Sequence, residues 1–378
     1  MISPEYFYTE LKKLGVQFFT GVPDSLLKEM CAYISDNASE EEHIISANEG
    51  GAVALAVGHY LATGRLPVVY MQNSGLGNTV NPLLSLADKD VYSIPMLLVI
   101  GWRGEPNVKD EPQHIKQGKV TLPLLDVMGI DYVVIDSETD SIETCLAELY
   151  MKATLESKPV ALVIRKGTFS NYIPTKRVET SYSGLTREQA IKIIVDCLTD
   201  NDFVVSTTGM ASRELFEYRK EKGHGHANDF LTVGGMGHAS QIATAIALSK
   251  PAQQVFCIDG DGAVLMHLGS LAISGQAKVS NFKHIIINNG AHDSVGGQPT
   301  IARCINITEI ARSCGYGVIE SSHRSDEELK TSVKKLISMK GPALLEVFVD
   351  KGNRKDLGRP TSSPVDNKHL FMQKIEGK

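Results

Sequence analysis

Two short polar motifs carry the most specific chemical signal in this sequence. The run DGDG at residues 259–262 follows an apolar stretch, and the run NNG at 288–290 follows a second one, with a segment of helical spacing between them. This pattern predicts a strand–helix–strand unit with polar residues at both strand ends. Ligands of open parallel sheets bind beyond the carboxyl ends of the strands, so Asp261 and Asn289 can converge on one ligand.

The side-chain oxygens of Asp261 and Asn289 indicate what that ligand is. Carboxylate and amide oxygens are hard donors, which suit Mg²⁺ and not zinc. Mg²⁺ shares its octahedron with phosphate oxygens and water, so two protein oxygens predict a phosphorylated ligand. A plainer interpretation is a glycine turn with an internally satisfied Asp261 beside an ordinary Asn-Gly turn. Spacing and strand context together favour the magnesium site.

Two other binding chemistries fit the sequence less well. The run GGMGHA at 234–239 follows a predicted strand, but its glycines miss the GxGxxG register of dinucleotide-binding proteins, and no acidic ribose ligand stands about 20 residues further on. His224 and His226 lie in a glycine-rich segment without a nearby cysteine pair, which is more typical of a loop than of a zinc site. The six cysteines form no CxxC pair and are expected to be reduced thiols.

Composition narrows the class of protein. Of the 378 residues, 42% are hydrophobic and 22% are charged, which is typical of a globular protein. The formal net charge is −6 and no block of Lys or Arg stands out, so we expect no nucleic-acid partner and no membrane partner. The N-terminus lacks the basic and apolar regions of a signal peptide, and no apolar run reaches the length of a membrane span, so we expect a cytoplasmic protein.

Strand and helix patterns alternate along both halves of the chain, which predicts an α/β protein with two doubly wound parallel-sheet domains. We expect a first domain at residues 1–170, a linker at 171–184 that is rich in Ser, Thr and Tyr, and a second domain at 185–378 that ends in a tail. Residues 105–118 are polar, contain two prolines and lack periodicity, so we expect an active-site loop there. No structure is predicted for the tail, residues 351–378.

The DGDG and NNG motifs together resemble the metal–diphosphate motif of thiamine diphosphate enzymes. The resemblance implies that Asp261, Asn289 and the backbone of Ala291 hold Mg²⁺. It also implies that Glu49, at a predicted strand-to-helix junction, bonds the aminopyrimidine ring of the cofactor, and that Met236 lies under the cofactor. The plainer roles are a helix-start carboxylate for Glu49 and core filling for Met236.

This family builds its active site between a pyrimidine-binding and a diphosphate-binding domain, usually on different subunits. Residues 1–170 and 185–378 would take these two roles, so the resemblance implies self-association with active sites at subunit interfaces. Most decarboxylases of the superfamily carry a central third domain, for which a chain of 378 residues has no room. Further cofactor contacts are expected from Asn73, Gly75, Thr208, Gly209, Met210, Gly260, Gly262, Ala263 and Ser294.

Five runs, spread over the chain as far as residue 300, resemble the phosphonopyruvate decarboxylases: TGVPDS at 20–25, SGLGN at 74–78, DEPQH at 110–114, RKGTF at 165–169 and NGAHDSVGGQPT at 289–300. The resemblance implies decarboxylation of 3-phosphonopyruvate to phosphonoacetaldehyde and CO₂ in phosphonate biosynthesis, with thiamine diphosphate and Mg²⁺ as cofactors. Two alternatives stay open: a lyase for sulfopyruvate or another 2-oxoacid, and a non-catalytic regulatory module of the same fold. Intact Glu49, Asp261 and Asn289 weigh against the module.

The remaining expectations concern protons and substrate. We expect Glu49 to activate the cofactor, and Asp24 and His114, on loops at strand ends, to handle protons near the substrate. The plainer interpretation of His114 is a solvated loop histidine. A phosphonate and a carboxylate need cationic or amide donors. The expected substrate contacts are Asp24, Ser25, Arg103, Lys116 and Lys166, with Arg165 as a further cation.

Overall fold

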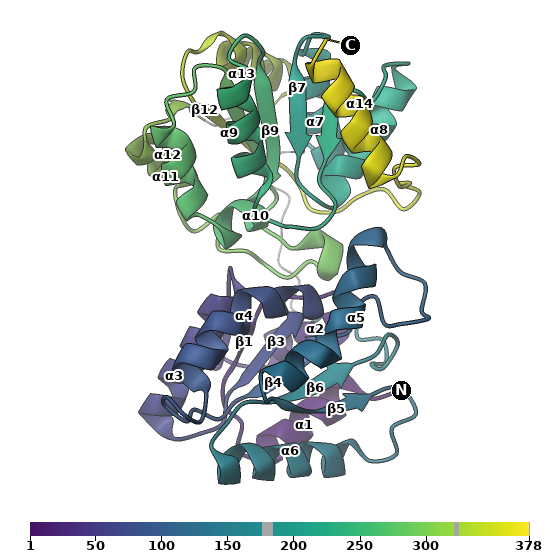
Figure 1. The fold of residues 1–378 in the computed structure, drawn as a ribbon, viewed down its shortest axis with the longest axis vertical. Coiled ribbons are helices and arrows are strands. Elements are labelled where there is room, and N and C mark those ends of the chain that lie inside the picture. Colours follow the sequence, from purple (N-terminus) through teal and green to yellow (C-terminus); the bar gives the residue numbers. More distant parts are fainter. Residues whose placement is uncertain (176–183, 321–324, 378) are drawn as a thin grey trace. The chain divides into compact units, whose positions relative to one another are not determined.

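The computed structural model describes residues 1–175, 184–320 and 325–377. The chain divides into two compact units, Met1–Val178 and Glu179–Lys378, called here the N-terminal unit and the C-terminal unit (Figure 1). The expected linker, residues 171–184, falls mostly outside the described residues. None of the described helices combines the length and the apolarity that crossing a membrane requires.

Six parallel strands form the sheet of the N-terminal unit, in the order β2-β1-β3-β4-β6-β5. The strands are β1 Phe19–Gly21, β2 His43–Ile45, β3 Val68–Gln72, β4 Leu97–Gly101, β5 Asp131–Ile135 and β6 Val160–Ile164. The helices are α1 Pro4–Lys13, α2 Lys28–Asn37, α3 Glu49–Thr63, α4 Leu76–Pro82, α5 Pro112–Val127 and α6 Ile142–Glu156, with a 3₁₀ turn η1 Asn73–Gly75 and a π-helical turn η2 Leu83–Ala87.

Both faces of this sheet are buried, as strand β3 shows. Val68 and Tyr70 join a core that includes residues of α1, α2 and α6. Val69 and Met71, which point the other way, join a core that includes residues of α3, α4 and α5. A parallel sheet needs helices on both faces, which explains why its strands are apolar runs rather than alternating ones.

The C-terminal unit repeats this plan with the strand order β11-β12-β10-β9-β7-β8. Its strands are β7 Phe203–Ser206, β8 Asp229–Leu231, β9 Val255–Gly260, β10 Phe282–Asn288, β11 Gly317–Ile319 and β12 Ala343–Phe348. Its helices are α7 Arg187–Asp196, α8 Met210–Glu221, α9 Ala239–Ser249, α10 Asp261–Met266, α11 Gly269–Gln276, α12 Ile307–Cys314, α13 Asp326–Ser338 and α14 Pro364–Ile375, with a 3₁₀ turn η3 Asp293–Val295.

The two faces of the second sheet are covered by different helices. Phe256 and Ile258 of β9 belong to a core that includes residues of α7, α8 and α13. Helix α9 packs on β7, β9 and β10, and α11 packs on α9. The predicted fold class, α/β with two doubly wound parallel sheets, is therefore confirmed.

The expected loop at residues 105–118 is wrong in its second half, because α5 begins at Pro112 and runs to Val127. Proline at the first helical position is compatible with a helix, since its missing N–H has no partner there anyway. Trp102 fixes the helix by donating its indole N–H to the carbonyl of Gly118 at 2.9 Å. Helix α5 also lies close to the backbone of Gly104. Only glycine fits at position 118, because an added Cβ there would overlap that backbone.

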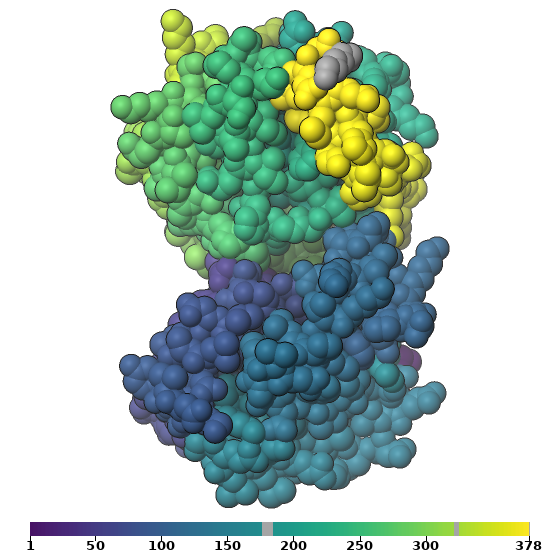
Figure 2. Space-filling model, viewed as in Figure 1, coloured from purple at the N-terminus to yellow at the C-terminus, as the bar shows by residue number. Residues whose placement is uncertain are grey.

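The tail contains a helix, α14, that the sequence pattern did not predict (yellow in Figures 1 and 2). Its Phe371 packs edge-on against Phe203 and Phe230. Its Asn367 bonds the edge strand β8: the side-chain oxygen accepts from the N–H of Leu231 at 3.0 Å, and the side-chain nitrogen donates to the carbonyl of Asp229 at 2.7 Å. The tail is thus part of the C-terminal unit.

Candidate functional site

The carboxyl edge of the N-terminal sheet collects several of the expected site residues. Glu49, Asp24, Asn73 and Arg103 follow β2, β1, β3 and β4, which are neighbours in that order. Lys166 follows β6 on the same edge. Parallel strands produce this gathering because all of them end at one side of the sheet.

Glu49 is the first residue of α3, and only 5% of it is exposed. Asn48 caps the helix, with its side-chain oxygen accepting from the backbone N–H of Gly50 at 2.8 Å. Asn78 of α4 donates to the Glu49 carboxylate at 2.7 Å. Gly75 lies against the same carboxylate, since a Cβ at that position would overlap it. The side chain of Glu49 is therefore held in one place by two neighbouring segments.

Asn78 is a positioning residue that the sequence does not predict. It lies within the SGLGN run, but no spacing rule pairs it with a carboxylate 29 positions earlier. The pairing arises because α3 and α4 pack side by side.

Asp24 is fully buried beside β1. One carboxylate oxygen accepts from the backbone N–H of Leu26 at 2.9 Å, and Gly101 leaves the space, because a Cβ there would overlap the carboxylate. Burial raises the pKa of Asp24 to about 6, while the Leu26 amide and the charge of Arg103 act in the opposite direction. Its carboxyl group can thus gain or lose a proton near neutral pH, as a proton-handling group must.

Arg103 and Ser25, two expected substrate contacts, bond each other: Nη1 of Arg103 donates to the hydroxyl of Ser25 at 2.8 Å. The rest of the guanidinium bonds both oxygens of Asp110, at 2.8 and 2.5 Å. A substrate anion at Arg103 would share the guanidinium with Asp110. The sequence gives no sign of this pair, because Asp110 lies in the segment expected to be a loop.

Asn73 connects three segments of the N-terminal unit. Its side chain bonds the backbone of Arg103 through both its nitrogen (2.8 Å) and its oxygen (3.1 Å), and also donates to the hydroxyl of Thr121 at 2.9 Å. The side-chain amide is thus occupied inside the unit. A cofactor contact of Asn73 stays a prediction, and its backbone is the part that could make it.

His114 lies in the first turn of α5 and not on a loop at a strand end, because the helix begins at Pro112. It is buried, so the interpretation as a solvated loop histidine is wrong as well. Burial and, to a smaller extent, the nearby charge of Arg103 lower the pKa of His114 to about 4, although the charge of Asp110 acts in the opposite direction. The imidazole is therefore neutral at pH 7 and can accept a proton only with difficulty.

The lysines expected to bind substrate are both exposed. Lys116 lies on α5 and Lys166 follows β6. Within the described part of the chain neither forms an ion pair, whereas Arg165 contacts Glu105 at 2.9 Å and Asp136 at 3.2 Å. The two lysines are thus more readily available to an anion than Arg165.

In the C-terminal unit, Asp261 begins α10 directly after β9, and 3% of it is exposed. Its carboxylate accepts from the hydroxyl of Thr300 at 2.5 Å. Burial raises the pKa of Asp261 to about 6; Thr300 and backbone amides, including that of Asn289, act in the opposite direction. A buried carboxylate at a strand end would be stabilised by a cation placed beside it.

Asn289 follows β10, the neighbour of β9 in the sheet. Its side-chain nitrogen donates to Asp293 at 2.7 Å, and its side-chain oxygen accepts from the N–H of Ala291 at 3.0 Å. Backbone bonds from Thr300 to Gly290 (3.0 Å) and from His292 to Gln298 (2.8 Å) flank Ala291. Carboxylate, amide and carbonyl oxygens therefore come from adjacent strand ends, and this donor set fits Mg²⁺.

Glycine-rich turns surround this edge. Gly209, with φ of +102°, turns the chain into α8, which begins at Met210. Thr208 accepts from the N–H of Gly234 at 3.0 Å, which joins the turns after β7 and β8. Other expected cofactor contacts in this unit lie at the end of β9 (Gly260), in α10 (Gly262, Ala263) and in η3 (Ser294).

Met236 lies between two glycines of positive φ, Gly235 (+59°) and Gly237 (+83°). Its terminal methyl group reaches Gly262 of the DGDG run, where an added Cβ would stand 3.3 Å away. The backbone amides at a helix start can bond a phosphate, and small residues there leave room for it. Met236 is thus placed beside the expected diphosphate loop, while its contact with the cofactor stays a prediction.

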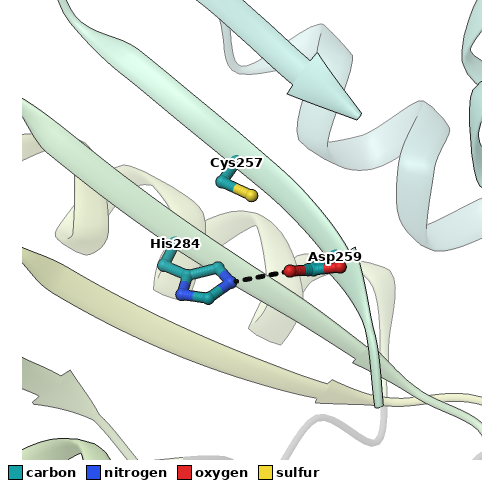
Figure 3. A group of neighbouring side chains, drawn as sticks. All are labelled: Cys257, Asp259 and His284. Carbon is teal, nitrogen blue, oxygen red and sulfur yellow. Dashed lines mark ion pairs between the residues drawn. The ribbon is translucent and has the colours of Figure 1, made fainter. Parts of the chain in front are cut away.

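Cys257, Asp259 and His284 form a second group of potential metal ligands behind this edge (Figure 3). All three are buried, and the carboxylate of Asp259 lies 3.5 Å from the imidazole of His284. Burial raises the pKa of the Cys257 thiol, so the thiol keeps its proton, which disfavours metal binding. Asp259 also accepts from the N–H of Gly260 at 3.1 Å, so the described contacts give it a role in shaping the DGDG turn.

Comparisons with known proteins match both units. The N-terminal TPP binding domain of thiamine pyrophosphate enzymes matches residues 3–126, and the C-terminal TPP binding domain matches residues 207–347. A phosphonopyruvate decarboxylase of Streptomyces viridochromogenes is 33% identical over 98% of this chain and 94% of its own length, and that of Streptomyces hygroscopicus is 32% identical over 99% and 94%. A sulfopyruvate decarboxylase of Methanosarcina acetivorans is 27% identical over 100% of this chain and 99% of its own.

Replacement of Gly75 by Ala should displace the Glu49 carboxylate, because the added methyl group occupies the same space. We expect the affinity for thiamine pyrophosphate, and any turnover that depends on Glu49, to fall about 100-fold. This is the usual effect of moving a functional group by about 1 Å. Gly77→Ala is the matched control, since nothing lies within 4 Å of a Cβ there. Calorimetric titration with thiamine pyrophosphate checks this, and equal affinities of the two variants would contradict it.

Asp24→Asn should reveal the free-energy cost of the buried carboxylate. The folded-state pKa of Asp24, about 6, lies above its ordinary value of 3.8, so its contribution to stability is present at low pH and is lost as the pH rises through about 6. Relative to the natural protein, the variant should therefore gain about 3 kcal/mol in unfolding free energy between pH 4 and pH 8. Urea denaturation across this pH range measures the gain, with the exposed Asp140→Asn as control; a gain independent of pH would contradict the assignment.

Proposed function

This chain belongs to the phosphonopyruvate decarboxylase family of thiamine pyrophosphate enzymes, and on that premise we propose that it decarboxylates 3-phosphonopyruvate to phosphonoacetaldehyde and CO₂. The observation that carries the proposal is similarity over nearly the whole length of two phosphonopyruvate decarboxylases. We place the reaction in phosphonate biosynthesis. Mg²⁺ is proposed as the metal because the donors of Asp261, Asn289 and Ala291 are all oxygen atoms.

The residues divide into two sets by the part of the cofactor they would hold. When bound, thiamine diphosphate supplies the electron sink that accepts the electron pair released with CO₂. Asp261, Asn289 and Ala291 would hold Mg²⁺ against the diphosphate, and the amides at the starts of α8 and α10 would bond its oxygens. Glu49, fixed by Asn78, would hold a proton at the aminopyrimidine ring.

We propose that Asp24 handles protons near the substrate and that His114 contacts the substrate as a neutral imidazole. The pKa of Asp24, about 6, allows both protonation states near neutral pH, which suits a group that gives and takes a proton. The pKa of His114, about 4, keeps the imidazole neutral, so it can serve as a hydrogen-bond partner of the substrate rather than as a cation. The two groups thus have different roles although both are buried.

The phosphonate group needs cationic partners. Lys116 and Lys166 are exposed and form no ion pair among the residues that the structure describes, so we assign the phosphonate to them before Arg103, which is bonded to Asp110 and Ser25. Ser25 can add its hydroxyl.

Sulfopyruvate is the second candidate substrate. A sulfonate resembles a phosphonate in shape and in oxygen acceptors but carries less negative charge. The fusion of two domains in one chain does not separate the two candidates, because the Methanosarcina acetivorans sulfopyruvate decarboxylase also aligns over the full length of this chain. Over nearly the whole chain, the identity is 33% to the phosphonopyruvate decarboxylase of Streptomyces viridochromogenes and 27% to this sulfopyruvate decarboxylase, which favours phosphonopyruvate as the substrate.

Glu49→Gln should keep the fold but reduce turnover by about 10²- to 10⁴-fold, the usual contribution of a positioned acid–base group. The assay follows CO₂ release from phosphonopyruvate, sulfopyruvate and pyruvate, with and without Mg²⁺ and thiamine diphosphate. The exposed Glu138→Gln on the same unit is the matched control and should stay fully active. Full activity of Glu49→Gln would refute the role of Glu49, turnover without the cofactor would refute the function, and preference for sulfopyruvate would change only the substrate.

We also propose that the chain self-associates, with active sites at subunit interfaces. Helix α3, which begins at Glu49, exposes a stripe of small and apolar residues: Gly51, Ala54, Leu55, Gly58, Leu61 and Ala62. Leu55 is 37% exposed and Leu61 70%, which is unusual for a helix this apolar. A second copy of the chain would bury this stripe.

Leu55→Glu should therefore weaken self-association, because it places a charge in the proposed interface. We expect the dissociation constant of the oligomer to rise about 10-fold or more, equivalent to a loss of about 1.4 kcal/mol. Analytical ultracentrifugation measures it, with Met151→Glu on α6 as control, since Met151 is 54% exposed on the opposite side of the sheet. A natural protein that is monomeric and active, or equal effects of the two variants, would contradict the interface.

A further inference from the structure

One carboxylate oxygen in the C-terminal unit accepts three hydrogen bonds from three separate segments. Oδ2 of Asp293 accepts from the side-chain nitrogen of Asn289 at 2.7 Å, from Nη1 of Arg187 at 3.0 Å and from the backbone N–H of Gly352 at 3.0 Å. The donors come from the turn after β10, from the start of α7 and from the segment after β12. Such convergence on a single atom fixes that atom firmly.

Arg187 is itself held on the opposite side. Its Nε and Nη2 bond the two oxygens of Glu214 on α8, at 2.8 and 3.0 Å. The side chains of Arg187 and Glu214 are 7% and 1% exposed, so water screens the pair little. A forked Arg–carboxylate pair is directional as well as strong. Arg187 therefore cannot follow a displaced Asp293, and Asp293 is fixed relative to two helices.

The contact with Asn289 decides how its amide group is oriented. A carboxylate accepts hydrogen bonds but donates none, so only the nitrogen end of the amide can face Asp293. The oxygen end then faces away, on the side where it accepts from Ala291. Without an acceptor at residue 293, the amide could rotate by half a turn and present its NH₂ group, which cannot bind a cation.

We propose that Asp293, held by Arg187 and Glu214, is a positioning residue that fixes the Asn289 amide with its oxygen toward the cation and thereby sets the affinity for Mg²⁺. The inference rests on the proposed function, since it assumes that Asn289 binds the metal of the cofactor complex. Asp293 itself does not contact the metal in this assignment. Asp293 also joins the segments after β10 and β12, because it accepts from Gly352. The turn that contains Asn289 and the end of the neighbouring strand β12 are thus linked.

The test is the Mg²⁺ concentration that supports binding of thiamine diphosphate, measured by isothermal titration calorimetry over a Mg²⁺ series. Asp293→Ala should raise this concentration by about 10- to 100-fold, the usual effect of losing a partner that orients a metal ligand. Asp293→Asn should restore most of the affinity, because its amide oxygen can take the place of Oδ2. Arg187→Lys, which keeps the charge but loses the forked bond, should show an intermediate rise and replaces Asp293→Ala if that variant does not fold.

A matched control separates orientation from general stability. Asp229 pairs with Arg219 through two bonds of 3.0 Å, and the side chains are 0% and 6% exposed, so this pair is as buried as that of Arg187 with Glu214 but does not touch Asn289. Asp229→Ala should lower the unfolding temperature and leave the Mg²⁺ requirement unchanged.

Three outcomes would overturn the inference. If Asp293→Ala, or Arg187→Lys in its place, requires the same Mg²⁺ concentration as Asp229→Ala, Asp293 is only structural while the proposed function stands. If Asp293→Asn is as weak as Asp293→Ala, charge and not orientation matters. If the natural protein binds no thiamine diphosphate at any Mg²⁺ concentration, both the proposed function and the positioning role fail.

Discussion

Both sheets consist of parallel strands with apolar side chains on each face, and this constraint decides where polar groups can be. Most side chains within the strands are apolar because helices cover both faces, and buried polar exceptions such as Asp259 and His284 contact each other. Polar residues are therefore concentrated where the strands end, and parallel strands all end at one edge. Glu49, Asp24 and Arg103 in one unit, and Asp261 and Asn289 in the other, lie at these edges for this reason. The position of these polar groups therefore follows from the parallel direction of the strands.

Burial at these edges also makes the carboxylates costly in the free protein. Asp24 and Asp261 both have a pKa of about 6, because burial disfavours the charged form more than the surrounding donors favour it. Asp24 and Asp261 are thus two carboxylates with a proposed role in proton transfer or metal binding whose charged form the fold disfavours. Such incomplete compensation leaves interaction energy available for a ligand.

The sequence predicted those parts of the structure that depend on local pattern. The alternation of strands and helices in both units has the expected character, because hydrophobic runs are visible in a short window. The DGDG and NNG motifs were predictable for the same reason: each closes a strand, and the spacing between them is that of one strand–helix–strand unit. The family comparison then agrees with the resemblance that these motifs carry.

Features that depend on contacts between distant residues could not be predicted. Helix α5 contains Gly118 and Pro123, which argue against a helix locally, and it is stabilised by the indole of Trp102. Helix α14 is held by Phe203 and by the edge of β8, more than 130 residues away in sequence. The Asn78–Glu49 and Arg187–Asp293 bonds likewise join side chains whose types are ordinary and whose proximity appears only after folding. Local propensity is a weak guide wherever such tertiary contacts decide.

The bonds of Asn367 to β8 have a consequence for how the protein behaves in a crowded solution. Strand β8 is the last in its sheet, and an unpaired strand edge offers N–H and C=O groups to any other chain with an open strand. The Asn367 side chain presents one donor and one acceptor to this strand, as a neighbouring strand would, without itself offering a new edge. A chain that ended before α14 would expose this template. The C-terminal helix thus covers this edge of the sheet against pairing with another chain.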